Sequence, residues 1–218
     1  MDKLFDSILK NTSSQDKWIY SCYSNEKVNI DFIEEKEFQL FRKTFEEIFE
    51  VEWMLQHLDS KPLGITVDTL KKVMSNKDKK HLFLAKMKAD YELTHMNNPV
   101  EKFTLKDWEG ILKNDFPDER LSSVLFINGE VAAYIMLHRS NKTSHYEISW
   151  VGLDETYQDI HLLKQLLFYQ LRGLQKNGVQ TVGIEVDSTN PVAMDLFDFL
   201  DLNDKRSWDS YIRVNDNN

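Results

Sequence analysis

An Asn-Gly pair at positions 128–129 separates two apolar runs, 124–127 and 131–137. Both residue types accept the positive φ angles of a two-residue type I′ turn, and such a pair between apolar segments is the strongest short-range signal for a β-hairpin. The chain is therefore expected to form an antiparallel pair of strands at this point.

Further strands and helices are predicted around the hairpin from the hydrophobic periodicity. Strands are expected at 81–85, 91–96, 146–153, 181–186 and 208–214. Helices are expected at 104–112, 162–175 and 192–200, with Asn190 opening the last of them. From residue 86 onwards the predicted order is thus strand, helix, hairpin, strand, helix, strand, helix and strand.

The first part of the chain is predicted to mix strands and helices. Segments rich in aromatic or alternating apolar residues at 18–24 and 28–33 suggest two short strands. Large apolar residues then recur at helical spacing, which predicts one long amphipathic helix over 34–58 with its phenylalanines facing the core. A short helix around 70–74 is expected to follow.

The composition limits the partners and the compartment. The formal net charge is −9 at pH 7, which disfavours binding to nucleic acid or to anionic membranes. No signal peptide and no apolar run of membrane-spanning length is visible. The single cysteine, Cys22, cannot form an intramolecular disulfide and is expected to pack in a strand. We therefore expect a cytoplasmic protein with no nucleic-acid or membrane partner, and the six scattered histidines predict no metal site.

Three segments in the second part of the chain carry a family resemblance. The first is the hairpin with its flanks at 128–134, and the second is the strand end at 151–158. The third is the strand at 178–186 followed by the helix at 190–197. In this order and spacing the segments resemble the GNAT superfamily of acyl-CoA N-acyltransferases over roughly residues 86–218.

The resemblance implies an α+β fold of the GNAT type, with a mixed, mostly antiparallel, twisted sheet flanked by helices. Residues 86–218 would form this domain, and residues 1–85 an N-terminal α/β extension. The role of the extension is open, since it could be a degenerate second GNAT half or an interaction domain.

The resemblance also implies where acetyl-CoA, the co-substrate, would bind. In the family, a loop of the form Gln/Arg-x-x-Gly-x-Gly/Ala leads into a helix whose first N–H groups bind the pyrophosphate. Gln158 matches this pattern, but His161 and Leu163 stand at the two small-residue positions, where side chains crowd the phosphate path. The implied cofactor-binding residues are Val151, Gly152, Leu153, Gln158, Asp159, Ile160, His161, Leu162, Leu163, Lys164 and Asn190.

The catalytic groups are implied by position in the same way. Acyl transfer to an amine needs a base that takes a proton from the amine, and an acid can protonate the departing thiolate. Glu147 is the candidate base, with a solvent-facing strand residue as an equal alternative. Phe197 stands where many family members have a tyrosine acid, so Tyr157 or Tyr169 would have to replace it.

The resemblance therefore implies an enzyme, an N-acetyltransferase that moves an acetyl group from acetyl-CoA to an amine of a small molecule or a protein. The negative net charge makes a cationic acceptor reasonable. The altered loop and Phe197 leave an alternative, a non-catalytic GNAT-fold binding or regulatory module that has lost CoA binding.

Overall fold

The computed structural model describes residues 17–58, 67–94, 102–157 and 160–214. The chain divides into two compact units. The smaller unit comprises Met1–Phe45 and Lys205–Asn218, and the larger unit comprises Glu46–Asp204. Every residue that the sequence suggests for catalysis or cofactor binding belongs to the larger unit.

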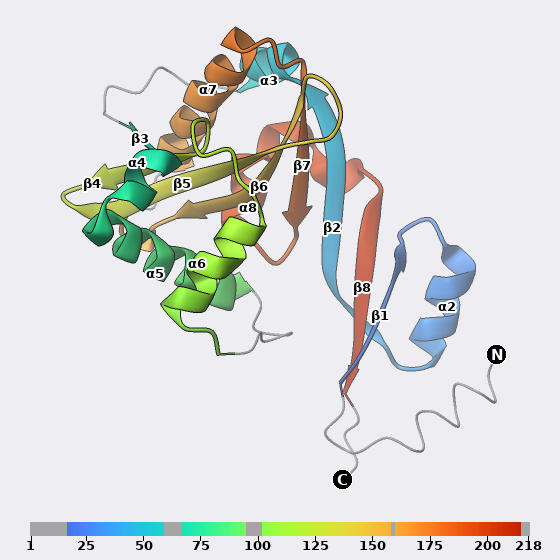
Figure 1. Ribbon diagram of the computed structural model, residues 1–218. Coiled ribbons are helices and arrows are strands. Elements are labelled where there is room, and N and C mark those ends of the chain that lie inside the picture. Colours follow the sequence, from blue (N-terminus) through green and yellow to red (C-terminus); the bar gives the residue numbers. More distant parts are fainter. Residues whose placement is uncertain (1–16, 59–66, 95–101, 158–159, 215–218) are drawn as a thin grey trace. The chain divides into compact units, whose positions relative to one another are not determined.

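A three-stranded antiparallel sheet and one helix make up the described part of the smaller unit. β8 (Ser207–Val214) pairs with β1 (Lys17–Tyr23) on one side and with the first part of β2 (Gln39–Glu50) on the other. α2 (Lys27–Glu35) lies beside β1 (Figure 1). The core of the smaller unit contains the buried side chains of Cys22, Ile33, Phe38 and Tyr211. The expected strand position of Cys22 is confirmed.

Two predictions for the first part of the chain are wrong. The segment 28–33, predicted as a strand, lies in α2, and most of the predicted helix at 34–58 is the strand β2, followed by the short helix α3 (Val51–His57). The spacing of the large apolar residues in this segment suits a helix, but β8 offers a partner with matching register from Gln39 to Phe45. Pairing across the chain outweighs the local periodicity here.

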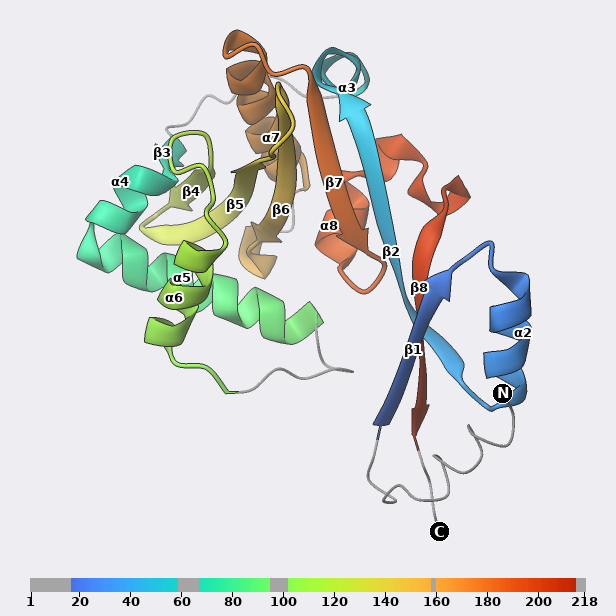
Figure 2. The ribbon, with the colours of Figure 1, turned by 45° about the vertical axis from the view of Figure 1, so that its right-hand side comes forward.

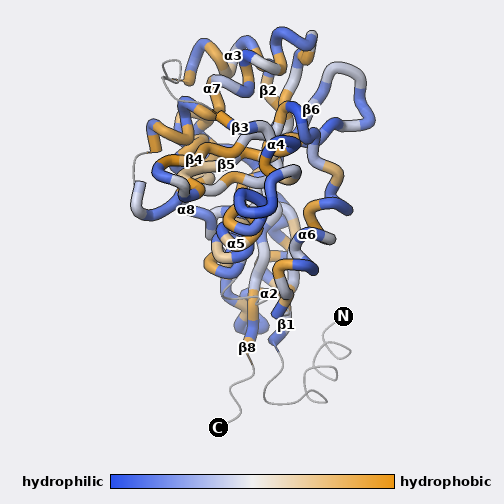
Figure 3. The backbone as a smooth tube through the Cα atoms, turned by 60° about the vertical axis from the view of Figure 1, so that its left-hand side comes forward, coloured by the Kyte–Doolittle hydropathy of each residue, from blue (hydrophilic) through white to orange (hydrophobic). Residues whose placement is uncertain are grey.

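The larger unit is built on a mixed sheet. Its strands are β3 (Val67–Thr69), β4 (Ser123–Ile127), β5 (Glu130–Arg139), β6 (His145–Leu153) and β7 (Thr181–Asp187). They lie side by side in the order β7-β6-β5-β4-β3. β6 and β7 run parallel, and the other neighbours pair antiparallel. β5 is buried from Val131 to Leu137, and β4 and β5 carry the hydrophobic colour of Figure 3.

Helices cover both faces of this sheet. α4 (Leu70–Ser75), α5 (Lys77–Thr94) and α6 (Leu105–Asn114) lie on one face, whereas α7 (Ile160–Lys176) lies on the other (Figure 2). α8 (Pro191–Leu196) contacts α7, β6 and β7. Among the described residues of this unit, 3₁₀ turns lie at Glu155–Tyr157, Asp198–Leu200 and Leu202–Asp204.

The strands predicted at 81–85 and 91–96 are also wrong, because the described residues of both segments lie in α5. Phe83, Leu84 and Met87 of this helix are buried against the sheet, in the same core cluster as Tyr134 of β5. Their spacing places them on one helical face. Residue 85, where the sequence suggested a boundary, lies inside this helix.

The remaining elements of the larger unit agree with their predictions. Asn128 and Gly129 have φ angles of 53° and 88°, as a type I′ hairpin turn requires. Thr104 caps α6 in a capping box, in which its hydroxyl accepts from the N–H of Asp107 and the Asp107 carboxylate accepts from the N–H of Thr104 at 2.8 Å. The strands at 146–153 and 181–186 and the helix at 162–175 are confirmed as β6, β7 and α7.

Candidate functional site

β6 and β7 separate part-way along their length. Their paired residues run from His145 with Thr181 to Ile148 with Ile184. From Ser149 onwards, β6 has no partner on the β7 side among the described residues. The free edge of the strand therefore presents backbone N–H and C=O groups that a ligand can bind.

A bulge in β6 lies at the same place. On the other side of the strand, Met136 of β5 pairs with Trp150 and the next residue, Leu137, pairs with Ile148. Ser149 is thus the extra residue, and a bulge of this kind bends the strand. The bulge and the end of the β7 pairing coincide, so β6 turns away from β7 just after Ile148.

The predicted backbone ligands Val151, Gly152 and Leu153 lie on this free segment. On the β5 side they pair with Ile135, Tyr134 and Ala133. There is also no room for a side chain at Gly152. A Cβ at this position would lie 2.2 Å from Cε1 of Tyr134 and 2.6 Å from Oδ2 of Asp90. Glycine is therefore required here by packing as well as being available for a ligand.

A partly buried polar group underlies the end of β6. Nζ of Lys86 donates to Oδ1 of Asp90 at 2.6 Å and to the carbonyl of Leu153 at 3.4 Å, and lies 3.6 Å from Oδ2 of Asp154. Burial raises the pKa of Asp90 although Lys86 acts in the opposite direction. Burial, and then the charge of Asp90, raise the pKa of Tyr134 well above its ordinary value, so this tyrosine stays protonated. The group ties α5 to the free segment of β6.

The N-terminus of α7 is the predicted pyrophosphate site. Gln158 and Asp159 lie outside the described residues, and the helix begins at Ile160. His161 is exposed, whereas Leu163 is fully buried in the core. Nζ of Lys164 donates to Oδ1 of Asp198 at 2.9 Å, so its charge is already paired.

Asn190 and Phe197 bracket α8. Oδ1 of Asn190 accepts a hydrogen bond from the N–H of Ala193 at 3.1 Å, which makes this residue the N-cap of the helix. Phe197 is 2% exposed at the other end. Tyr157, one of its two possible substitutes as an acid, donates its hydroxyl to the carbonyl of Ile127 at 3.2 Å. Tyr169, the other, is half exposed on α7.

Glu147 lies on β6 just before the bulge. In register it stands between His138 of β5 and Gly183 of β7, and its side chain is 56% exposed. Nε2 of His145 lies 3.9 Å from Oε1 of Glu147, and Nδ1 of His145 is hydrogen-bonded to Oγ1 of Thr181 at 2.8 Å. Sequence reasoning singled out Glu147 alone. His145 could also have been identified from the sequence, because residues two apart on a strand lie on the same face of the sheet.

A second polar contact, which was not predicted, joins β5 and β6 to the residue after α6. Nε1 of Trp150 donates to Oδ2 of Asp115 at 2.7 Å, and Nε2 of His138 lies 3.0 Å from the same oxygen. The ring of Trp150 packs against Tyr91 and Trp108, with centroids 5.5 Å and 6.2 Å away. These contacts fix the loop after α6 against β5 and β6.

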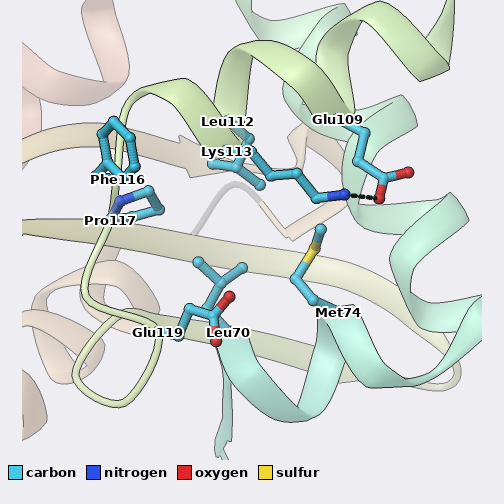
Figure 4. A pocket seen from close by; sticks show the side chains of 8 residues that line it. All are labelled: Leu70, Met74, Glu109, Leu112, Lys113, Phe116, Pro117 and Glu119. Atoms are coloured by element: carbon cyan, nitrogen blue, oxygen red, sulfur yellow. Dashed lines mark hydrogen bonds and ion pairs between the residues drawn. The ribbon is translucent and has the colours of Figure 1, made fainter.

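An open groove of about 380 Å³ lies between α4, α6 and the loop that follows α6. Figure 4 shows its eight lining residues, Leu70, Met74, Glu109, Leu112, Lys113, Phe116, Pro117 and Glu119. The ion pair of Lys113 with Glu109, at 2.7 Å, lies at its edge (Figure 4). None of the predicted site residues that the structure describes lines this groove.

Within the described ranges, no three His, Cys, Asp or Glu side chains are grouped as a metal ion would require. Over the same ranges, none of the helices has both the length and the apolar character needed to cross a membrane.

Residues 84–200, more than half of the chain, match the sequence model of the Acetyltransferase (GNAT) family. The chain belongs to the GNAT acetyltransferase family. Its predicted fold class, an α+β GNAT fold with a mixed sheet flanked by helices, is confirmed. No curated protein matches the sequence of this GNAT chain.

Solved structures agree with the family assignment at the level of the fold. A GCN5-related N-acetyltransferase from Sphaerobacter thermophilus is 14% identical with a TM-score of 0.60, covering 97% of this chain and 64% of its own. An acetyltransferase of the GNAT family from Colwellia psychrerythraea is 11% identical with a TM-score of 0.56, covering 96% of this chain and 71% of its own. A tandem GNAT protein from the clavulanic acid biosynthesis pathway is 8% identical with a TM-score of 0.57, and the match covers 90% of this chain and 63% of that protein. The present chain thus spans less than two thirds of the first and the third of these proteins.

Proposed function

We propose that this GNAT-family chain transfers an acetyl group from acetyl-CoA to an amine of a small molecule or a protein. The observation that carries the proposal is the separation of β6 from β7 at Ser149, with the exposed carboxylate of Glu147 two residues earlier. A free strand edge for the amides of the pantetheine arm and a base for the amine are thereby adjacent on one strand.

The free segment of β6 supplies the first part of the proposed cofactor site. Val151 and Leu153 have backbone N–H and C=O groups without a β7 partner in the described ranges. Amide groups of the pantetheine arm are the complementary partners, because they too carry one donor and one acceptor each. In this proposal Gly152 contributes backbone alone, since Tyr134 occupies the space beneath it.

The N-terminus of α7 supplies the second part. The first N–H groups of a helix have no partner within the helix and carry a positive partial charge, which suits a pyrophosphate. The amides of Ile160, His161 and Leu162 take this role in the proposal, and the proposed cofactor-binding set also includes Gln158 and Asp159 before them and Leu163 and Lys164 after them. Leu163 is compatible with it, because its side chain is buried in the core rather than exposed at the surface.

Glu147 is the proposed base. A protonated amine cannot attack the thioester, so the carboxylate takes the proton that the amine must lose. Phe197 has no proton to donate to the departing sulfur. A thiol has a pKa of about 8.5, so near neutral pH the thiolate is an acceptable leaving group without a dedicated acid. The net charge of −9 favours a cationic acceptor.

The alternative of a binding module without catalysis draws support from one observation. Phe197 is buried and lacks the hydroxyl that many members of the family use as an acid. Both proposed substitutes are unfavourable, because the Tyr157 hydroxyl is hydrogen-bonded to a backbone carbonyl and Tyr169 is half exposed. In this reading the fold would have lost CoA binding and would serve as a binding or regulatory module without turnover.

Calorimetric titration with acetyl-CoA, free CoA and adenosine 3′,5′-bisphosphate tests the binding half of the proposal. Micromolar binding of acetyl-CoA is expected, and no heat and no thermal shift up to millimolar ligand would overturn it. Release of free thiol in the presence of a panel of amines then tests turnover. Glu147→Gln is expected to lower kcat by roughly 100-fold with the affinity for acetyl-CoA unchanged. Glu130→Gln, an exposed substitution on the hairpin, is the matched control.

A further inference from the structure

His145 lies between two polar side chains on neighbouring parallel strands. Its ring is 5% exposed. Nδ1 is hydrogen-bonded to Oγ1 of Thr181 at 2.8 Å, and Nε2 lies 3.9 Å from Oε1 of Glu147. Thr181, His145 and Glu147 thus form a row that ends at the carboxylate exposed beside the β6 bulge.

The chemistry of the row determines where the imidazole proton is. An ionised carboxylate can only accept hydrogen bonds, so it attracts Nε2 when that nitrogen carries the proton and repels its lone pair. A neutral imidazole with the proton on Nε2 has a lone pair on Nδ1, and the Thr181 hydroxyl can donate to that lone pair. The Glu147 carboxylate therefore favours the tautomer with the proton on Nε2, and the Thr181 hydroxyl, which can donate or accept, completes this tautomer by donating to Nδ1.

Gly183 of β7 provides the room for this arrangement. It is the register partner of Glu147. A Cβ at this position would lie 3.3 Å from Cγ of Glu147 and 3.3 Å from Nε2 of His145. A methyl group would therefore press between the carboxylate and the imidazole, and the absence of one lets the two side chains face each other.

We propose that Thr181 and His145 are positioning residues that hold the Glu147 carboxylate at the separation of β6 and β7. The function of the pair rests on the proposed acyl transfer, in which Glu147 receives the proton of the amine. A carboxylate that is more than half exposed has many rotamers open to it, and the attraction of a buried ring nitrogen 3.9 Å away favours one of them. Positioning of a catalytic group in this way contributes to kcat and leaves substrate binding unchanged.

The tautomer can be measured without any activity assay. The ¹⁵N chemical shifts of the His145 ring, recorded on the full chain near neutral pH, are expected to show one tautomer with the proton on Nε2. Thr181→Val removes the hydroxyl with little change of shape and is expected to give a mixture of tautomers. Thr181→Ser keeps the hydroxyl and is expected to keep the single tautomer. Thr143→Val, in the exposed turn before β6, is the matched control. A proton on Nδ1 in the unsubstituted chain would overturn the proposal.

The second measurement follows Glu147 itself. In the unsubstituted chain the ¹³C signal of the Glu147 carboxylate and its side-chain couplings are expected to report one rotamer. In Thr181→Val and in Gly183→Ala they are expected to report an average over several rotamers. Gly183→Ala leaves the bond between Thr181 and His145 in place, so it should disturb Glu147 while the His145 tautomer persists. If Glu147 averages equally in all variants and in the unsubstituted chain, the positioning role is refuted even though the protein folds.

Turnover separates this proposal from the proposed function. Where acyl transfer is detected, Thr181→Val and Gly183→Ala are expected to lower kcat roughly tenfold with KM for acetyl-CoA unchanged, and Thr181→Ser should restore most of kcat. A fall in kcat that Thr181→Ser does not rescue would contradict the role of the hydroxyl. A chain that shows the expected tautomer and a single Glu147 rotamer but transfers no acyl group would instead refute the proposed function alone.

Discussion

The ring of Tyr134 occupies the space beside Gly152, where a Cβ would lie only 2.2 Å from Cε1 of the ring. The ring is fully buried between β5 and Phe83 of α5, which meets it edge-on with centroids 5.4 Å apart. The ring has little freedom to move aside, so the backbone of β6 at the proposed cofactor site is set by the core beneath it.

Gly152→Ala is therefore expected to destabilise the larger unit. Overpacking a well-filled core costs about 1–3 kcal/mol, and the short distances here place the expected loss at the upper end. Urea unfolding measures it. Gly110→Ala is the matched control, because no atom lies within 4 Å of a Cβ added there in α6, and it is expected to gain about 0.5–1 kcal/mol from helix propensity. Equal stability of the two variants would show that the Tyr134 ring moves aside at little cost in free energy.

Asp68 is expected to make the stability of the larger unit depend on pH. It is 5% exposed and is paired with Lys72, at 2.5 Å, and with Lys79. Burial alone would raise the pKa of Asp68, but the hydrogen bonds and charges of the two lysines together lower it below the ordinary 3.8. The carboxylate therefore contributes to the free energy of unfolding above pH 3.8, and this contribution is lost as the pH falls through the lower folded-state pKa.

Asp68→Asn should cost about 2 kcal/mol in urea unfolding at pH 7, since it leaves two lysines facing each other without an anion. The difference from the unsubstituted chain should shrink as the pH is lowered below 3.8. Asp195→Asn, which alters an exposed carboxylate on α8, should change little at any pH. A cost that stays constant down to the acid transition would mean that packing, and not charge, accounts for the loss.

Asn190→Ala is expected to cost about 1 kcal/mol, because it removes the acceptor of the Ala193 N–H at the start of α8. The corresponding fall in Tm is roughly 2–4 °C for a chain of this size. Asn190→Ser keeps a capping oxygen and should retain both the Tm and the affinity for acetyl-CoA. If Asn190→Ser is stable but binds acetyl-CoA more weakly, the Asn190 side chain contacts the cofactor directly, as the family resemblance implies.

The elements that the sequence predicted correctly are those with a local cause. The turn at Asn128 and Gly129, the capping box at Thr104 and the cap at Asn190 each depend on residues within a few positions, so their signals stand in the sequence. At Asp201, φ is 51°, a left-handed conformation that Asp tolerates better than most residues.

The errors have a non-local cause. β2 takes its strand form from β8, which lies far along the chain, and the pattern of α5 is readable only once its buried face against β5 is known. The same holds for the candidate site. Glu147 could be named from its position in the family resemblance, but the hydrogen bond of His145 with Thr181 joins residues 36 positions apart through the parallel register of β6 and β7. No local pattern encodes that register.

The two positions where the family has small residues are expected to respond very differently to truncation. Leu163 is fully buried in α7, so Leu163→Ala should cost about 2–5 kcal/mol through lost packing and the cavity left behind. His161 is exposed, so His161→Gly should cost only about 1 kcal/mol through helix propensity. Leu93→Ala, at an exposed position of α5, is the control for truncation without burial.

Binding of acetyl-CoA to the same variants tells whether either side chain obstructs the proposed phosphate site. His161→Gly is expected to keep or increase the affinity, since it removes a Cβ at the helix N-terminus while the backbone amides remain. Leu163→Ala, measured at a temperature where it is folded, should leave the affinity unchanged, because the Leu163 side chain is buried in the core. Tighter binding by Leu163→Ala would instead mean that the leucine stands in the path of the pyrophosphate, and that the loop departs from the family in function as well as in sequence.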